Sequence, residues 1–377
     1  MQEIIIIEKN YDDIKALLKK LNSQKFFLVC DAALQYLEIN NFFGNIDIPY
    51  YSFSGFSANP LYESVVQGVK EYKDNNCDVI LALGGGSCID VAKCIKLFSS
   101  LDSSKNFLQQ QYKKNDIKLI AIPTTAGTGS ESTRFAVIYY NGEKQSIADE
   151  SIIPDYAILI ADLLVTLTVY QKKCTVLDAL CQGIESFWSV NSNEESKEYS
   201  QNAIALLCEN IDGYIAGKNN VNKHIMMGAN FAGRAINISQ TTAAHAMSYK
   251  LTSMFNLPHG HAVAICLPVL WEHMSENSNN VADKRGSAYV NEVFLEIAKL
   301  IGKNTVKEAI EWFKNMLGSM EITSPHFSKE DLEALAKSVN ITRLKNNPID
   351  LSCQILYSLY KKISSKREGI RGKIVDR

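Results

Sequence analysis

The feature that most constrains the fold is a series of short, uninterrupted apolar runs in the first 160 residues. The runs FFLVCD (26–31), DVILALGGG (78–86) and IKLIAIPTT (117–125) are mostly apolar and end in Asp, Gly or Thr. A strand with one face in water alternates apolar and polar residues, whereas a strand buried on both faces does not need to alternate. These runs therefore predict strands of a parallel sheet that is covered on both faces.

The segments between and after these runs have helical spacing. PLYESVVQGVKEYKDNN (60–76) and IDVAKCIKLFS (89–99) repeat apolar residues every three to four positions, so strand, glycine turn, helix and strand follow one another. This order is typical of a doubly wound α/β fold. Beyond about residue 165 the segments become long and helix-periodic, and strand-like runs nearly vanish.

The length and these patterns predict two domains, because 377 residues exceed what one hydrophobic core usually supports. We expect a Rossmann-like α/β dinucleotide-binding domain over residues 1–163 and an all-helical domain over residues 164–377. No linker rich in Pro, Gly or Ser separates them, which predicts a tight junction with a small-molecule cleft.

Charge and cysteine content exclude several functions. The 39 basic and 41 acidic residues give a net charge of -2, with no basic surplus for nucleic acid. No run approaches the roughly 20 apolar residues that span a bilayer, and the N-terminus has an acidic residue where a signal peptide needs basic ones. The nine cysteines lack CxxC spacing, and an odd number in apolar segments indicates reduced thiols. We expect a cytoplasmic enzyme without a nucleic-acid or membrane partner.

A glycine run follows the second apolar strand and opens a helix. Leu83-Gly84-Gly85-Gly86-Ser87 precedes the helical segment that begins near Ile89. Glycines let the backbone approach a phosphate, and a helix N-terminus supplies free N–H groups and a favourable dipole. The run is not GxGxxG, and it also fits a tight turn between strand and helix.

A second polar loop, IPTTAGTGSE (122–131), follows the next apolar strand. Two neighbouring strand ends with small, donor-rich loops favour a site for a diphosphate and its ribose, although Ser and Thr also cap helices. Asp31 ends the first strand, where an acidic residue accepts hydrogen bonds from a ribose and repels a 2′-phosphate. Asp31 favours NAD over NADP, but it equally fits an N-cap for the following segment.

Candidate metal ligands lie in the second half of the chain. Four of the six histidines fall between residues 245 and 273, namely His245, His259, His261 and His273. Asp178 and Gln182 are four residues apart, so they share one helix face. A carboxylate and two imidazoles suit Fe²⁺ or Zn²⁺ with an open position for substrate oxygen. Each residue also has a structural interpretation, and we assign His273 to structure.

The segments GGGSCIDVAK, IPTTAGTGSE, DALCQGIES and HAMSYKLTSMFNLPHGHAVA occur in an order that resembles the iron-containing alcohol dehydrogenase family. The resemblance extends over most of the chain. It implies an α/β dinucleotide-binding domain, a helical domain, and a cleft that holds one divalent metal, Fe²⁺ or Zn²⁺, and NAD(P)H. It also implies a homo-oligomer, most simply a dimer.

The resemblance assigns roles residue by residue. The implied metal ligands are Asp178, His245 and His259, with Gln182 at a position where the family commonly has a histidine. Tyr249 stands where many members carry a second histidine, so Tyr249 and His261 become the candidate proton donors. The implied cofactor-binding positions are Asp31, Asn59, Gly85, Gly86, Ser87, Asp90, Thr124, Thr125, Thr128 and, less distinctively, Lys144.

Within this family, GSESTRFAVIYYNGEKQSIADESIIPDY and ISQTTAAHAMSYKLTSMFNLPHGHAVAICLP are most similar to the phosphonoacetaldehyde reductase subgroup. A phosphonate needs cationic partners, and Arg134, Arg234 and Lys250 lie beside these segments. Each of them also fits an ordinary surface charge. The resemblance predicts reduction of phosphonoacetaldehyde to 2-hydroxyethylphosphonate.

Three other functions remain open. A general short-chain alcohol or diol dehydrogenase of the same family has the same motifs. A lyase similar to dehydroquinate synthase uses bound NAD transiently, but IPTTAGTGSE and DALCQ favour the dehydrogenase. A nucleotide sensor without catalysis is supported only by Gln182 and Tyr249, and the retained Asp178, His245 and His259 favour an enzyme.

Overall fold

The computed structural model describes residues 2–8 and 10–364, which divide into two compact units. The first unit contains the described residues up to Phe187 together with Ser192–Gln240, and the second contains Trp188–Asn191 and the described residues from Thr241 onward. The predicted bounds of 1–163 and 164–377 follow the change from strands to helices, and as domain limits they stay a prediction.

Six strands of the first unit form one sheet in the order β1-β8-β5-β4-β2-β3, in which every neighbouring pair is parallel. The strands are β1 (Glu3–Ile7), β2 (Phe26–Cys30), β3 (Tyr50–Phe53), β4 (Val79–Gly84), β5 (Lys118–Pro123) and β8 (Tyr156–Ile160). Gly84 at the end of β4 pairs with Pro123 at the end of β5. The loops that follow these two strands therefore begin side by side, and the predicted parallel sheet is confirmed.

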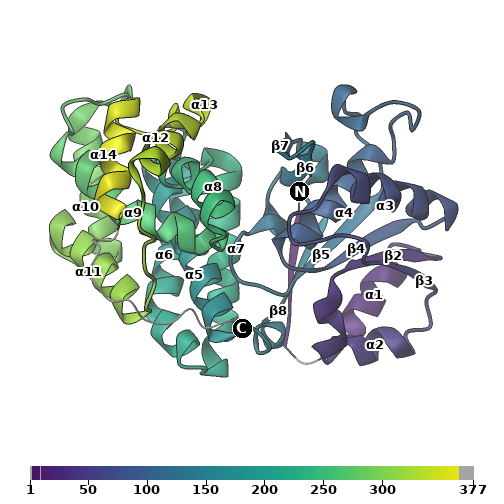
Figure 1. Cartoon of the computed structure of the whole chain (residues 1–377). Coiled ribbons are helices and arrows are strands. Elements are labelled where there is room, and N and C mark those ends of the chain that lie inside the picture. The colour runs from purple at the N-terminus through teal and green to yellow at the C-terminus, as the bar shows by residue number, and fades with distance from the viewer. Residues whose placement is uncertain (1, 9, 365–377) are drawn as a thin grey trace, which may run out of the picture. The chain divides into compact units, whose positions relative to one another are not determined.

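Helices cover both faces of this sheet, as the uninterrupted apolar runs predict. Phe26 and Leu28 of β2 pack with α1 (Asp12–Lys20) and α2 (Ile39–Asn45), whereas Phe27 and Val29 pack with α3 (Tyr62–Asp74) and α4 (Gly86–Phe98). Figure 1 shows the two helix pairs on opposite sides of the sheet. Because successive side chains of a strand point to opposite faces, each residue of β2 enters a core and all five are buried.

The first unit also contains an antiparallel hairpin that the sequence analysis did not predict. Strands β6 (Phe135–Tyr140) and β7 (Glu143–Ala148) pair across a turn at Asn141 and Gly142, whose φ angles are 52° and 76°. Two consecutive positive φ angles favour Asn-Gly, because these residues tolerate the left-handed region. The tyrosine-rich run before this dipeptide and the polar residues after it are the two strands.

The remaining helices of the first unit are α5 (Val169–Trp188), whose last residue belongs to the second unit, α6 (Glu194–Ile215) and α7 (Asn222–Ser239). The 3₁₀ helices of this unit are η1 (Ala32–Tyr36), η2 (Phe107–Gln109), η3 (Ser130–Ser132), η4 (Glu150–Ile152), η5 (Ala161–Leu164) and η6 (Asn219–Val221). The segment after Asp31, which the sequence analysis treats as one helix, forms η1 and then α2.

The second unit consists of helices (Figure 1). They are α8 (Ala243–Phe255), α9 (His259–Glu276), α10 (Gly286–Leu300), α11 (Val306–Ser319), α12 (Lys329–Ser338), α13 (Ile341–Leu344) and α14 (Cys353–Ile363). After β8, the described residues contain no strand beyond one isolated bridge between Val281 and Ile349, which confirms the predicted helical half.

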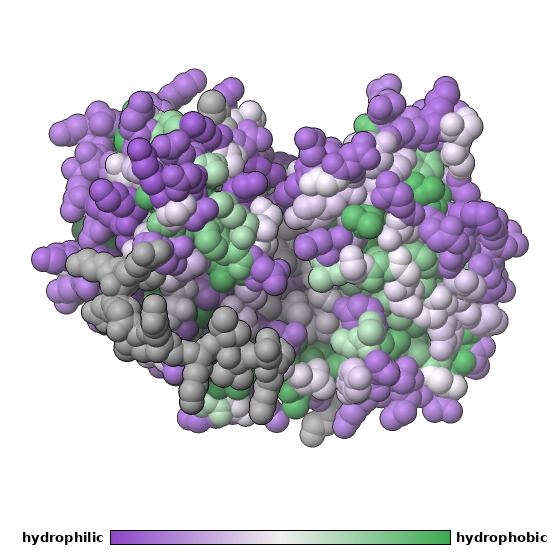
Figure 2. All heavy atoms as spheres, in the orientation of Figure 1, coloured by the Kyte–Doolittle hydropathy of each residue, from purple (hydrophilic) through white to green (hydrophobic). Residues whose placement is uncertain are grey.

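The described helices include none with the length and apolar character needed to span a membrane. On the face shown in Figure 2, hydrophilic residues cover most of the described surface of each unit, and hydrophobic residues occur in small groups.

Candidate functional site

The two glycine-rich loops at the ends of β4 and β5 contact each other closely. Gly85 caps the N-terminus of α4, and the backbone N–H of Thr124 donates to the carbonyl of Gly84 at 3.1 Å. A Cβ atom placed on Gly86 would lie 2.7 Å from Oγ1 of Thr128, and one on Gly85 would lie 3.6 Å from Cγ2 of Thr125. A side chain at position 86 would displace Thr128, so this approach requires glycine. The structure brings together the loops that we predicted to bind a dinucleotide.

The other predicted cofactor residues lie around these loops or on neighbouring elements. The Ser87 hydroxyl donates to the carbonyl of Ala58, beside Asn59. The Asp31 carboxylate accepts a hydrogen bond from the backbone N–H of Ala33 at 2.9 Å and thereby caps η1. Asp31 is thus a helix cap in this structure, and its ribose-binding role stays a prediction. Lys144 lies half-buried on β7.

Asp90 and Lys93 of α4 form a buried polar cluster with the segment that follows β5. The Lys93 ammonium is fully buried and donates to Oγ of Ser130 (2.9 Å), Oγ1 of Thr133 (3.1 Å) and the carbonyl of Phe135 (2.8 Å). Asp90 accepts from the Ser130 hydroxyl at 2.6 Å and from the backbone N–H of Val137 at 2.9 Å. These contacts hold the segment after β5 against α4, so the role that the structure shows for Asp90 is to accept hydrogen bonds from this segment.

Burial shifts the pKa values in this cluster. Desolvation lowers the pKa of Lys93 to about 8, while Asp90 and Glu131 partly oppose the shift. Desolvation also raises the pKa values of Asp90 and Glu131, each of which keeps a hydrogen bond that favours its charged form. The sequence analysis missed Lys93 and Glu131. A charged residue inside an otherwise apolar helix was the available signal for Lys93.

Asp178, His245 and His259 form a group that could hold a metal ion. Each offers one ligand atom, and these atoms all lie within 4.8 Å of one another. Asp178 and His245 are buried and His259 is half-buried. One carboxylate and two imidazoles match the donor set that iron and zinc accept.

Gln182 lies one turn after Asp178 on α5 and is 3% exposed. Its Nε2 donates a long hydrogen bond of 3.4 Å to the carbonyl of Thr128, and its Oε1 has no hydrogen-bond partner among the described residues. A buried amide oxygen without a donor is costly, so this atom has the chemistry of a further ligand. Its coordination of a metal stays a prediction.

The two candidate proton donors have different surroundings. Nε2 of His261 donates to the carbonyl of Thr323 at 2.8 Å, and burial lowers the pKa of His261. The ring of Tyr249 lies parallel to the ring of His259, with centroids 5.7 Å apart and planes 3° apart. The Tyr249 hydroxyl accepts a 3.0 Å hydrogen bond from Nη1 of Arg343. The proton on His261 is therefore engaged with the backbone, while Tyr249 lies beside a candidate ligand.

The three predicted substrate cations do not gather at one point. Arg134 pairs with Glu150, with 2.7 Å between Nη1 and Oε1, and Arg234 lies 4.0 Å over the ring of Tyr199 and donates to its hydroxyl. Lys250 is exposed on α8. Their substrate roles stay predictions, and the structure draws attention instead to Arg343, which the sequence analysis did not single out.

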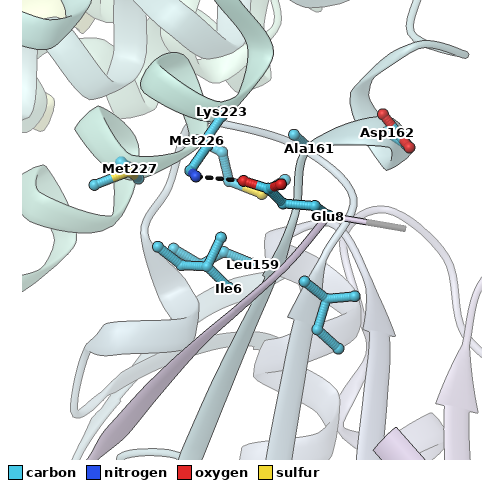
Figure 3. A pocket seen from close by; sticks show the side chains of 9 residues that line it. Ile6, Glu8, Leu159, Ala161, Asp162, Lys223, Met226 and Met227 are labelled. Carbon is cyan, nitrogen blue, oxygen red and sulfur yellow. Dashed lines mark hydrogen bonds and ion pairs between the residues drawn. The ribbon is translucent and has the colours of Figure 1, made fainter. Parts of the chain in front are cut away.

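The first unit contains a cavity of about 150 Å³ at the same edge of the sheet as the loops after β4 and β5. It lies at the ends of β1 and β8 beside α7, where Lys223 forms a 2.6 Å ion pair with Glu8 (Figure 3). The described residues that line it are Ile6, Ile7, Glu8, Leu159, Ala161, Asp162, Lys223, Met226 and Met227, and none of them is a predicted site residue.

Comparison with known families decides the classification. A family model described as iron-containing alcohol dehydrogenase matches residues 2–161, and the C-terminal model of the same family matches residues 173–364. The chain belongs to the iron-containing alcohol dehydrogenase family. As a member of this family it is an oxidoreductase that acts on alcohol and aldehyde groups, and the resemblance inferred from the sequence motifs is confirmed.

Individual members of the iron-containing alcohol dehydrogenase family differ in substrate. The chain is 29% identical to a phosphonoacetaldehyde reductase of Streptomyces viridochromogenes, over 81% of each chain, and 28% identical to an alcohol dehydrogenase of Thermococcus barophilus, over 86% of this chain and 87% of the relative. Its fold matches that of sulfoacetaldehyde reductase from Bifidobacterium kashiwanohense in complex with NAD⁺, with a TM-score of 0.87, 23% identity and 97% coverage of both chains.

Proposed function

We propose that this enzyme reduces a small anionic aldehyde to its alcohol with NAD(P)H and one divalent metal, and that phosphonoacetaldehyde is the substrate. The balanced reaction consumes the aldehyde, NAD(P)H and one proton and yields 2-hydroxyethylphosphonate and NAD(P)⁺. The observation that carries the proposal is the group Asp178, His245 and His259 in a member of this family. The phosphonate is supported by the similarity to a phosphonoacetaldehyde reductase, and NADH is favoured by Asp31.

The residues present fit a divalent metal. The three ligand atoms within 4.8 Å of one another suit Fe²⁺ or Zn²⁺, and the Oε1 atom of Gln182 is a further neutral donor. When bound, the metal supplies a Lewis acid that polarises the aldehyde carbonyl, and the nicotinamide supplies the hydride. An amide binds such a metal more weakly than an imidazole, so we expect a metal affinity below that of a member with histidine at this position.

The chain itself positions the reactants. In this proposal the N–H groups at the start of α4 and the hydroxyls of Thr124, Thr125 and Thr128 hold the diphosphate and its ribose. The buried Lys93 fixes the second of these loops. A cofactor held in this way needs little reorganisation when hydride leaves it.

Tyr249 is the better placed of the two candidate proton donors. Its oxygen accepts from Arg343, and its ring lies against His259, a candidate metal ligand. His261 already directs its Nε2 proton to Thr323. We therefore assign proton donation to Tyr249 and an orienting role to His261.

The test is an NADH and NADPH oxidation assay over small aldehydes, including phosphonoacetaldehyde, with added Fe²⁺ or Zn²⁺. We expect one reduced cofactor consumed per aldehyde, a metal requirement, and the highest kcat/KM for the anionic aldehyde. The His259→Ala variant should lose metal, measured by elemental analysis, together with activity. Unchanged metal content in this variant would remove the ligand assignment, and bound NAD that is never consumed would favour the lyase.

Two further parts of the proposal come from the sequence. A homodimer is what the family resemblance implies, and light scattering measures it directly. A cytoplasmic location is what the predicted reduced thiols favour, and cell fractionation tests it.

A further inference from the structure

Arg343 lies on the helical unit beside a candidate metal ligand, and neither the motifs nor the predicted cation set includes it. It belongs to α13, which begins after the Asn340 cap. The guanidinium carbon lies 5.0 Å from the centroid of the Tyr249 ring, and Nη1 donates to the Tyr249 hydroxyl at 3.0 Å. A cation that both faces an aromatic ring and donates to its hydroxyl is held in a defined orientation.

Tyr249 connects this cation to His259. Its ring is parallel to the His259 imidazole at 5.7 Å, and it lies one helical turn after His245 on α8. The Arg343 guanidinium and the His259 imidazole both contact the Tyr249 ring. The sum of the two distances sets an upper limit of about 11 Å between the guanidinium carbon and the centroid of the His259 ring. A short aldehyde has its carbonyl oxygen and its anionic oxygens only a few bonds apart, so the cation that binds its head group must lie on a side chain close to the candidate metal ligands.

We propose that Arg343, oriented by Tyr249, binds the anionic head group of the aldehyde, a phosphonate or a sulfonate. This proposal rests on the aldehyde reductase function proposed above and adds its specificity-determining residue. A guanidinium carries five N–H donors in a planar fork that fits the oxygens of such a group, and the Tyr249 hydroxyl takes one of them. Tyr249 is then a positioning residue for Arg343 as well as the assigned proton donor.

The surroundings of the three predicted cations support this choice. Arg134 is paired with Glu150. Arg234 lies over Tyr199 as Arg343 lies over Tyr249, but the Tyr199 ring is stacked on Phe231 and not on a candidate metal ligand. Lys250 follows Tyr249 directly but is exposed. Arg343, by contrast, contacts a ring that is itself stacked on the candidate metal ligand His259.

The experiment compares phosphonoacetaldehyde with propanal, a neutral aldehyde of similar size, at saturating cofactor and metal. Loss of a charge-assisted hydrogen bond is worth about 10- to 100-fold, so Arg343→Met should reduce kcat/KM for phosphonoacetaldehyde by about that factor. The kcat/KM for propanal should change less than threefold. Arg343→Lys keeps the charge without the fork and should lie between wild type and Arg343→Met. Lys345→Met, an exposed lysine two residues later, is the matched control and should behave as wild type.

A binding measurement without turnover separates head-group recognition from catalysis. Calorimetric titration of the metal-free protein with 2-hydroxyethylphosphonate should show weaker binding for Arg343→Met than for wild type and Lys345→Met. Ethylene glycol, which lacks the phosphonate, should show no such difference. Tyr249→Phe should raise KM for phosphonoacetaldehyde through loss of the hydroxyl that orients Arg343, and should lower kcat for both aldehydes through loss of the proton donor.

The outcomes distinguish the two proposals. If the wild-type enzyme has the same kcat/KM for propanal as for phosphonoacetaldehyde, the proposed substrate class is wrong. If the wild-type enzyme prefers the anion and Arg343→Met keeps that preference, Arg343 is not the head-group site. Circular dichroism spectra and melting temperatures of all variants must match wild type, and Arg343→Gln provides a second neutral variant if Arg343→Met does not fold.

Discussion

Replacement of Lys93 by methionine is the perturbation whose effect on the first unit can be worked out most fully. Methionine is nearly as long as lysine but carries no charge and no donor. The change removes three hydrogen bonds from Nζ, of 2.9, 3.1 and 2.8 Å, to the Ser130 and Thr133 hydroxyls and the Phe135 carbonyl. All three acceptors lie in the segment that follows β5 and ends at Phe135, the first residue of β6. The variant should therefore loosen the attachment of this segment to α4.

The expected loss of stability follows from burial. Removing one member of a buried charge cluster typically costs about 3–5 kcal/mol, because the remaining charges have no partner. Asp90 and Glu131 remain in the cluster, where Glu131 is buried and Asp90 is half-buried. The methionine recovers part of the loss through its own apolar burial, about 1–2 kcal/mol. We therefore expect the free energy of unfolding to fall by about 3 kcal/mol.

Lys70→Met is the matched control. Lys70 forms a shorter contact, 2.6 Å between Nζ and Oδ2 of Asp74, but the two side chains are 67% and 57% exposed. An exposed pair of this kind contributes little to stability, because water and salt screen its charges and both side chains lose conformational freedom. The comparison therefore tests whether burial, and not distance, determines the contribution of a lysine in this fold.

The assay must report on the unit that contains Lys93. The three tryptophans, Trp188, Trp271 and Trp312, all belong to the second unit, so their fluorescence does not monitor the sheet directly. Urea unfolding followed by circular dichroism, with hydrogen exchange of peptides covering residues 118–140, measures the first unit. If Lys93→Met lowers the free energy of unfolding by no more than Lys70→Met does, burial does not determine the contribution of these lysines and our reasoning is refuted.

The same lysine predicts the sign of a pH dependence. The pKa of Lys93 in the folded chain is about 8, below its ordinary 10.5, because burial disfavours the charge. Between these two values the unfolded chain binds a proton that the folded chain does not, so wild-type stability rises with pH over this window. The stability difference between wild type and Lys93→Met should therefore increase from pH 8 to pH 10 and stay level below pH 8. A difference that falls over this window would contradict the buried-cation assignment.

Two glycine substitutions probe the polar loop. Gly86→Ala should weaken NADH binding about tenfold or more in a fluorescence titration, because the new Cβ would lie 2.7 Å from the Thr128 hydroxyl. Gly44 has open space around it, so Gly44→Ala is the control and should bind NADH as wild type does. Gly233→Ala should lower the melting temperature although alanine has the better helix propensity, because the new Cβ would lie 2.6 Å from the carbonyl oxygen of Gly129. An unchanged melting temperature would show that α7 and the loop around Gly129 separate easily.

Much of the first unit could be predicted because its strands have a strong local signal. A strand buried on both faces has to be apolar at nearly every position, so FFLVC and VILALG are recognisable without any knowledge of their neighbours. The β6–β7 hairpin was missed although Asn141-Gly142 is a strong hairpin signal. Its strands are half-buried and mix polar with aromatic residues, so apolar runs alone do not reveal them.

The candidate site was predictable in part for a different reason. The loops after β4 and β5 could be placed together, because parallel strands that are neighbours end at the same edge. The candidate metal ligands are dispersed over about 80 residues. Helix spacing and the cluster of histidines made them candidates, and the family motifs gave the ligand set, because helical periodicity shows which residues share a face but not which partner they meet. Arg343 could not be found in this way, because its role depends on how α13 packs against α8 and not on the residues around it.

The two departures from the family pattern have different physical consequences. Gln182 stands where the family commonly has a histidine, and as a ligand it would be a weaker, neutral donor that lowers the affinity for the metal. Tyr249 replaces an imidazole by a phenol, whose oxygen accepts from the Arg343 guanidinium while its ring stacks on His259. A protonated imidazole at this position would instead repel the guanidinium. A tyrosine here allows a permanent cation to lie beside the candidate ligands, so in our proposal this substitution and the preference for an anionic aldehyde would follow from one change.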